Sequence, residues 1–139
     1  MPHANCVYCN PKEETVLWSG AHCRVLHVAD PKFPGFCRVV WNAHATEFTE
    51  LDDASRAHVM KIVAIVERAL RTLLSPDKIN LASLGNQVPH LHWHIIPRYR
   101  DDSHFPDAIW AAPQRGGVVR ALPDDFAASI KKALDSARP

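Results

Sequence analysis

The chain has 139 residues, of which 47% are hydrophobic and 22% are charged, a composition typical of one folded globular domain and not of a disordered or fibrous chain. Sixteen Lys and Arg residues nearly balance fifteen Asp and Glu residues, so no strong overall charge attracts the protein to nucleic acid or to an acidic membrane. Apolar stretches of about ten residues are too short to span a bilayer, and the first residues lack a signal-peptide pattern. We therefore expect one domain over residues 1–139, cytoplasmic, with neither a membrane nor a nucleic acid as partner.

Three short segments rich in strand-forming residues come first. Residues 15–18 and 22–28 lie on either side of the turn residues Ser19 and Gly20, and residues 36–41 follow a breaker rich in proline and glycine. Strands joined in this way predict an antiparallel meander.

A long helix is predicted after the meander. Apolar residues recur at steps of three and four between Val59 and Leu73, Asp52 is a suitable N-cap, and Ser75 with Pro76 ends the pattern. A helix of about twenty residues is about 30 Å long, enough to cover one face of a sheet.

Two more strands and a second helix complete the prediction. Residues 78–84 and 90–99 are predicted strands joined by a tight connection, residues 104–120 show no period, and residues 124–137 carry apolar side chains on one helical face. The predicted fold class is α+β: an antiparallel sheet of about five strands with one long helix and a C-terminal helix.

Three histidines alternate with apolar residues in the last predicted strand. His90, His92 and His94 are separated by Leu91 and Trp93. Successive side chains of a strand point to opposite faces, so the imidazoles should share one face, roughly 6.6 Å apart, while the apolar side chains face the core. This strict alternation favours a binding site over three unrelated half-buried histidines.

Two chemistries fit such a row of imidazoles. A His-x-His pair on a strand can chelate a catalytic zinc ion, although Asp77 is the only acidic residue between Glu67 and Asp101. Alternatively, a neutral imidazole can attack phosphorus without a separate base, provided that an acceptor holds its other nitrogen. We prefer the nucleophile and keep the metallohydrolase as the alternative.

The segment from His90 to Ile96 resembles the signature of the histidine triad (HIT) superfamily of nucleotide hydrolases and transferases. The segment from Gly35 to His44 resembles the strand that precedes the long helix in that family, and residues 85–88 resemble its phosphate-contacting loop. The resemblance extends over residues 6–100. It implies a HIT-like fold, in which residues 101–139 form the region for specificity and dimerisation.

The resemblance also implies a role for each histidine. His92 matches the family's nucleophile, which attacks the α-phosphate of a nucleotide and forms a nucleotidyl-histidine intermediate that water hydrolyses. His94 matches the histidine that contacts phosphate and aids the leaving group, and His90 matches a supporting residue. The implied substrate is a nucleotide conjugate, such as a dinucleoside polyphosphate or a nucleoside phosphoramidate.

Four further residues are predicted to bind the substrate. Asn86 and Gln87 occupy loop positions where the family places phosphate-binding side chains, and Asn80 lies near a family asparagine that contacts the nucleotide. Arg98 continues the strand on the face of His92 and should reach distal phosphates if that strand stays regular.

A metal site is predicted near the N-terminus. Cys6 and Cys9 have the two-residue gap that lets both thiolates reach one zinc ion, but two ligands do not complete a tetrahedral site. The resemblance implies that His44 and His90 complete it, as they do in many bacterial HIT proteins. The zinc would be structural, and no organic cofactor is expected.

Two expectations concern the rest of the chain. Trp110 lies in the segment that helps to fix specificity in HIT proteins, so we expect it to cover a nucleotide base or to face a partner subunit. HIT proteins commonly dimerise, which implies a homodimer.

A third function is kept beside the hydrolase and the metallohydrolase: a nucleotide-binding module without turnover. Tight AMP binding without hydrolysis of any nucleotide conjugate would identify it.

Overall fold

The computed structural model describes residues 3–139, which form one five-stranded antiparallel sheet. The strands are β1 (Thr15–Ser19), β2 (Cys23–His27), β3 (Cys37–Trp41), β4 (Lys78–Ala82) and β5 (His92–Arg98). They are ordered β1-β2-β3-β5-β4, so the histidine strand lies between β3 and β4. The predicted fold class is confirmed.

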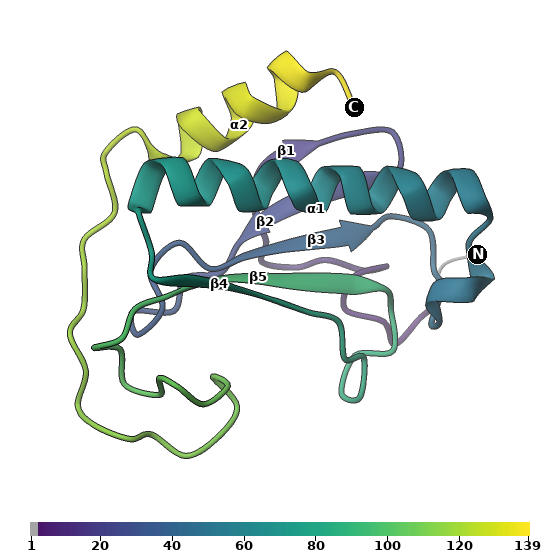
Figure 1. The fold of residues 1–139 in the computed structure, drawn as a ribbon. Helices are drawn as coiled ribbons and strands as arrows, with labels where there is room; N and C mark the ends of the chain where they lie inside the picture. Colours follow the sequence, from purple (N-terminus) through teal and green to yellow (C-terminus); the bar gives the residue numbers. More distant parts are fainter. Residues whose placement is uncertain (1–2) are drawn as a thin grey trace.

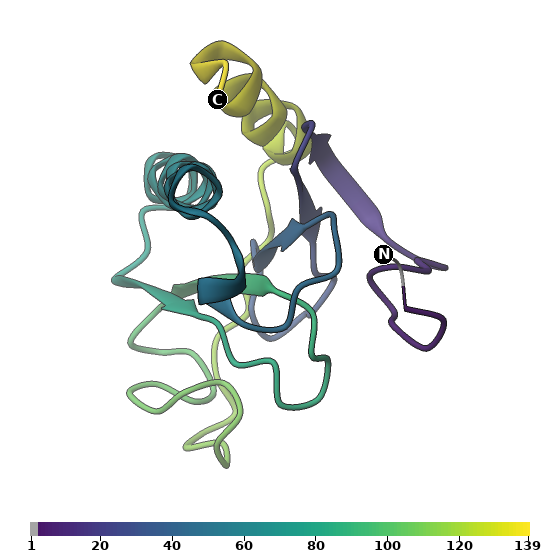
Figure 2. The same cartoon turned by 90° about the vertical axis from the view of Figure 1, so that its right-hand side faces the viewer.

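Two helices cover one side of this sheet (Figure 1), α1 (Asp53–Leu74) and α2 (Phe126–Ala137). The view along the long helix shows α2 beside α1 and above β1 (Figure 2). The predicted helix start is confirmed, because Oδ1 of Asp52 accepts a hydrogen bond from the backbone N–H of Ser55 at 2.8 Å. A short 3₁₀ helix at Phe48–Glu50 was not predicted.

The apolar core lies between the helices and the sheet. Leu91, Trp93 and Ile95 are buried there, as the alternation predicts. The helices contribute a stripe of buried side chains to the same core: Val59, Ile62, Val63, Val66, Leu70, Phe126, Ile130 and Leu134. In the described residues, no helix is long and apolar enough to cross a membrane.

The opposite face of the sheet is also covered, but by loops. All seven residues of β5 are buried. Tyr8 of the N-terminal segment packs with Leu26 and Val40 on this face, and the segment that follows β5 lies on the side opposite the helices (Figure 1). The histidine strand is therefore enclosed on both faces, so the surroundings of its imidazoles are much less polar than water.

Candidate active site on the histidine face

The register of the sheet determines which side chains surround the histidines. His92 and His94 lie opposite Val40 and Arg38 of β3, respectively, and Leu26 of β2 lies opposite Arg38. Antiparallel partners point to the same face of a sheet. Arg38 is thus the nearest charged neighbour of His94 on this face.

One expectation about the triad needs correction. β5 begins at His92, so His90 lies just before the strand and not within a row of three strand residues. Its Nε2–H donates to the backbone carbonyl of Trp41 at 2.5 Å, and its Nδ1 lies beside the sulfur of Cys6. Both nitrogens are engaged, which leaves only two of the three imidazoles for a substrate.

His92 has the arrangement that a nucleophile requires. Its Nδ1–H donates to the backbone carbonyl of His90 at 2.6 Å, so Nε2 carries the lone pair in the neutral ring. Nε2 has no partner among the described residues, and none of their buried side-chain nitrogens is unpaired, so solvent reaches it. Burial lowers the pKa of His92, the hydrogen bond to His90 opposes this, and Arg38 lowers the pKa further.

His94 has the opposite arrangement. Its Nδ1 accepts a hydrogen bond from Nε of Arg38 at 3.3 Å, so the proton of the neutral ring is on Nε2. Burial lowers its pKa to about 4, and the charges of His92 and Arg38 act in the same direction. The ring centroids of His92 and His94 are 4.9 Å apart, so an open lone pair and an N–H donor lie side by side.

A cavity of about 740 Å³ is lined by residues that contact these rings, and its volume is within the usual range for small-molecule sites. Leu26, Val28 and Val88 provide apolar parts of its lining. Tyr8 and Arg38 also line it, and they contact His92 and His94, respectively. His92 and His94 are not themselves part of the lining, so Tyr8 and Arg38 connect the cavity to the two rings.

The predicted metal ligands lie together. One ligand atom from each of Cys6, Cys9, His44 and His90 lies within 4.8 Å of the others. Nδ1 of His90 is 3.2 Å from the sulfur of Cys6, and Nδ1 of His44 is 3.4 Å from the sulfur of Cys9. Sulfur and nitrogen ligands of one tetrahedral zinc ion are about 3.6 Å apart, so the four residues fit such an ion.

The surroundings of this cluster also suit a metal. A metal-binding histidine usually donates its second N–H to a carbonyl or a carboxylate, and His90 does so to Trp41. Tyr8 lies between the two cysteines in sequence, and its ring contacts those of His90 and His92. The segment that carries the thiols thus packs directly on the histidine strand.

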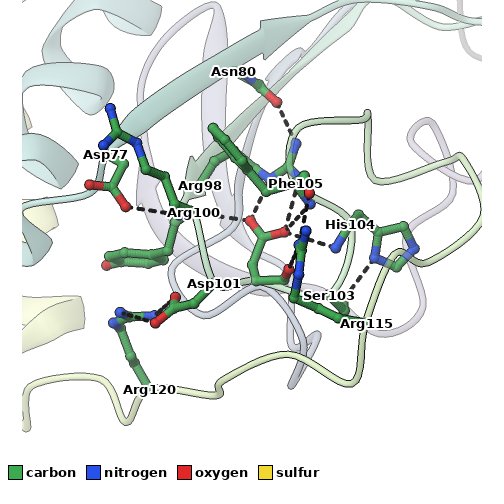
Figure 3. Close-up of polar contacts among 12 residues, drawn as sticks. Asp77, Asn80, Arg98, Arg100, Asp101, Ser103, His104, Phe105, Arg115 and Arg120 are labelled. Atoms are coloured by element: carbon green, nitrogen blue, oxygen red, sulfur yellow. Dashed lines mark hydrogen bonds and ion pairs between the residues drawn. The ribbon is translucent and has the colours of Figure 1, made fainter.

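Arg98 and Asn80, both predicted to bind the substrate, make hydrogen bonds within the protein. Arg98 is buried, and its Nε and one terminal nitrogen donate to the two carboxylate oxygens of Asp102 at 2.8 and 3.0 Å. Its other terminal nitrogen donates to Oδ1 of Asn80 at 2.7 Å, as Figure 3 shows. Three of its five N–H groups are thus engaged inside the protein, and its contact with distal phosphates stays a prediction.

Asn86 and Gln87 lie in the loop between β4 and β5, and both are exposed. Gly85, just before them, has a positive φ of 75°, a conformation that glycine adopts at no steric cost. Their role in phosphate binding stays a prediction.

Sequence reasoning missed two residues of this site. Arg38 was overlooked although it is a charged residue in an otherwise apolar predicted strand, and the alternation rule puts it on the face of Val40. Tyr8 was overlooked because it lies between Cys6 and Cys9, and that segment was interpreted only as a metal site. Trp110, which the sequence analysis did name, also contacts the site, because the centroids of its ring and of the His94 ring are 5.1 Å apart.

The donor geometry does not favour the metallohydrolase alternative. In residues 3–139, the group of three or more donors that could hold a metal comprises Cys6, Cys9, His44 and His90. His92 and His94 lie outside this group and are arranged as a base and a donor.

Comparison with known proteins identifies the family of this chain. The family model described as HIT domain matches residues 10–101. A HIT-like protein of Mycoplasma pneumoniae is 27% identical over 114 residues, covering 76% of this chain and 79% of that protein. An adenosine 5'-monophosphoramidase of Schizosaccharomyces pombe is 26% identical over 106 residues, covering 73% and 77%.

Solved structures of histidine triad proteins have a similar fold. A histidine triad protein from Bradyrhizobium japonicum is 29% identical with a TM-score of 0.70, covering 84% of this chain and 87% of that chain. One from Marinobacter aquaeolei is 25% identical with a TM-score of 0.73, covering 88% and 90%. Among curated sequences, a bis(5'-adenosyl)-triphosphatase of Saccharomyces cerevisiae is 28% identical over 93 residues, covering 63% of this chain and 45% of that enzyme.

Proposed function

Because the chain belongs to the HIT family, we propose that it is a nucleotide hydrolase or transferase whose nucleophile is His92. The observation that carries this proposal is the pair of imidazoles on β5. His92 has Nδ1–H fixed on the carbonyl of His90 and Nε2 open, and the adjacent His94 presents an N–H.

The proposed reaction has two steps. In the first, the lone pair on Nε2 of His92 forms a bond to the α-phosphorus, and the bond from phosphorus to the leaving group breaks with its electron pair. In the second, water attacks phosphorus and releases a proton to solvent, the P–N bond breaks, and its electron pair returns to Nε2. Two displacements replace one difficult one.

The local geometry suits the charges that this reaction creates. Bonding to phosphorus gives the imidazole of His92 a positive charge, and the carbonyl of His90 that accepts its Nδ1–H stabilises that charge. The Nε2–H of His94 can donate to a phosphate oxygen. Neither role requires a metal ion at the reacting atoms.

Two relatives support the substrate class. One is an adenosine 5'-monophosphoramidase and another is a bis(5'-adenosyl)-triphosphatase. Substrates of this chain are accordingly proposed to be nucleoside phosphoramidates or dinucleoside polyphosphates.

A single-turnover reaction with nucleotide labelled at the α-phosphorus tests the proposal. Label should remain on the protein as an acid-labile adduct, and His92→Ala should abolish both adduct and turnover. His58→Ala, which removes a histidine of α1 far from β5 in sequence, is the matched control. Turnover by His92→Ala at the wild-type rate would refute the nucleophile, and AMP binding with no turnover by the wild type would identify a binding module.

The Cys6, Cys9, His44 and His90 cluster is proposed to hold a structural zinc ion. Such an ion would connect the N-terminal segment to the residue just before β5. It would supply stability and orientation, and the chemistry would remain with His92 and His94.

A homodimer is proposed as well. β4 is an edge strand of the sheet, and Leu81 and Leu84 at this edge are 53% and 54% exposed. Sedimentation of the purified protein would measure the mass of the particle directly.

A further inference from the structure

The arginines on the histidine face differ in how their charge is balanced. Arg24 of β2 is paired with Glu14 at 2.7 Å, and Arg98 of β5 is paired with Asp102 at 2.8 Å. Arg38 lies between them in the sheet and, among the described residues, takes part in no ion pair. Its side chain donates a hydrogen bond to the neutral ring of His94 and lies near the hydroxyl of Tyr8.

The guanidinium of Arg38 is also held in place. It is half-buried and lies 5.4 Å from the centroid of the Phe36 ring, while its Nε donates to His94. It opposes the rise that burial causes in the pKa of Tyr8, which places it near that hydroxyl. A half-buried charge without a counterion is costly unless a ligand supplies the opposite charge.

The position of Arg38 indicates the ligand. The side chain lines the cavity of about 740 Å³ and contacts the imidazole beside the nucleophile. With Nε on His94, the two terminal nitrogens remain, and a planar guanidinium binds phosphate oxygens in pairs. Lys12 and Glu13 line the same cavity but are exposed, so their charges are more strongly screened.

We propose that Arg38 binds the non-bridging oxygens of the phosphoryl group that is transferred to His92, and that it simultaneously orients His94. This inference rests on the proposed function and adds a phosphate-binding residue to it. Through one side chain, the site recognises the negative charge of the substrate and keeps the Nε2–H of His94 directed away from Arg38. Arg38 is thus a catalytic residue by its contact with the phosphoryl group.

Binding of two probes tests the charge recognition. AMP and adenosine differ by one phosphate, so the ratio of their affinities measures what the phosphate contributes. Arg38→Met should weaken AMP by about 30-fold, the amount typical of a lost charge-assisted hydrogen bond, and leave adenosine affinity unchanged. Arg38→Lys, which restores charge without the planar fork, should recover part of the loss.

Lys78→Met is the matched control. Lys78 lies opposite Arg98 on the same sheet face and is exposed, so its loss changes the net charge equally without touching the cavity. It should leave the ratio of AMP to adenosine affinity at the wild-type value. Circular dichroism selects folded variants, and Arg38→Gln replaces Arg38→Met if the latter does not fold.

Nitrogen-15 NMR tests the orientation of His94. In the wild type, Nδ1 of His94 should show the shift of an acceptor and Nε2 that of a protonated nitrogen, whereas Arg38→Met should mix the two tautomers. Transfer of labelled nucleotide to His92 should slow by about 100-fold in Arg38→Met. An unchanged affinity ratio in a folded Arg38 variant would overturn the inference. Binding of AMP that depends on Arg38, in a wild type without turnover, would instead refute the proposed hydrolase.

Discussion

The carbonyl of His90 accepts the Nδ1–H of His92 at 2.6 Å, so the residue beside the cysteines orients the proposed nucleophile through the main chain. The ring of His90 is itself held by the carbonyl of Trp41 and lies against Cys6. A change at the cysteine cluster therefore reaches His92 through only two residues of backbone.

Metal removal should accordingly affect catalysis as well as stability. Cys6→Ser combined with Cys9→Ser should abolish binding of one zinc ion per chain, lower the melting temperature by several degrees, and reduce kcat by about tenfold, the low end for changes around metal ligands. Metal content, calorimetry and kinetics on the same samples measure the three effects.

Cys23→Ala is the control for this experiment. Cys23 is buried in the main core and lies outside the group of Cys6, Cys9, His44 and His90. The variant should lose stability and retain zinc. Zinc at one equivalent in the Cys6 and Cys9 double variant would contradict the assignment of the cluster.

Much of this site could be predicted because it depends on local pattern. The alternation around His92 fixes the faces of β5, and the cap at Asp52 fixes the start of α1. The four metal ligands came from a resemblance, since spacing alone identifies only Cys6 and Cys9.

The contacts that could not be predicted depend on long-range pairing, which the local pattern does not contain. The direction of Arg98 was predicted correctly, but nothing near it in sequence shows that Asp102 and Asn80 would bind its guanidinium. The role of Arg38 likewise depends on which strand pairs with β3, and β5 lies more than fifty residues away along the chain.

The buried Arg98 and Asp102 pair should be a main determinant of stability. Asp102→Asn should cost about 3 kcal/mol of unfolding free energy, because it leaves the charge of Arg98 buried without a counterion. The adjacent Asp101 and Arg120 pair is 48% and 39% exposed in its side chains; it also appears in Figure 3. Asp101→Asn should cost less than about 1 kcal/mol, and urea denaturation of both variants measures the difference.

The same carboxylate should make the protein sensitive to acid. Burial raises the pKa of Asp102, but hydrogen bonds from Arg98 and from the backbone N–H groups of His104, Tyr99 and Phe105 outweigh this and lower it to about 2. Because the folded pKa lies below the unfolded value of 3.8, the stabilisation is complete above pH 5 and disappears as the pH falls towards 2. The stability gap between wild type and Asp102→Asn should therefore narrow between pH 5 and pH 3. A constant gap across this range would show that the carboxylate titrates normally.

Trp110 should help to keep His94 neutral. The indole packs 5.1 Å from the imidazole of His94, and burial is the main reason why the pKa of that ring is about 4. The charged or titratable groups that face it are His92 on its own strand and Arg38 on β3. Trp110→Ala admits water to the ring and leaves both neighbours in place, so the pKa should rise towards 6.5 without reaching it. The wild-type ring, whose pKa of about 4 lies below this range, stays neutral from pH 5 to 8. The ring of the variant should begin to protonate at the acidic end of the same range.

An NMR titration of the His94 ring measures its pKa directly, and Val119→Ala, at an exposed position in the same connecting segment, is the control. An unaltered pKa in Trp110→Ala would mean that Phe36 and the sheet alone exclude water from His94.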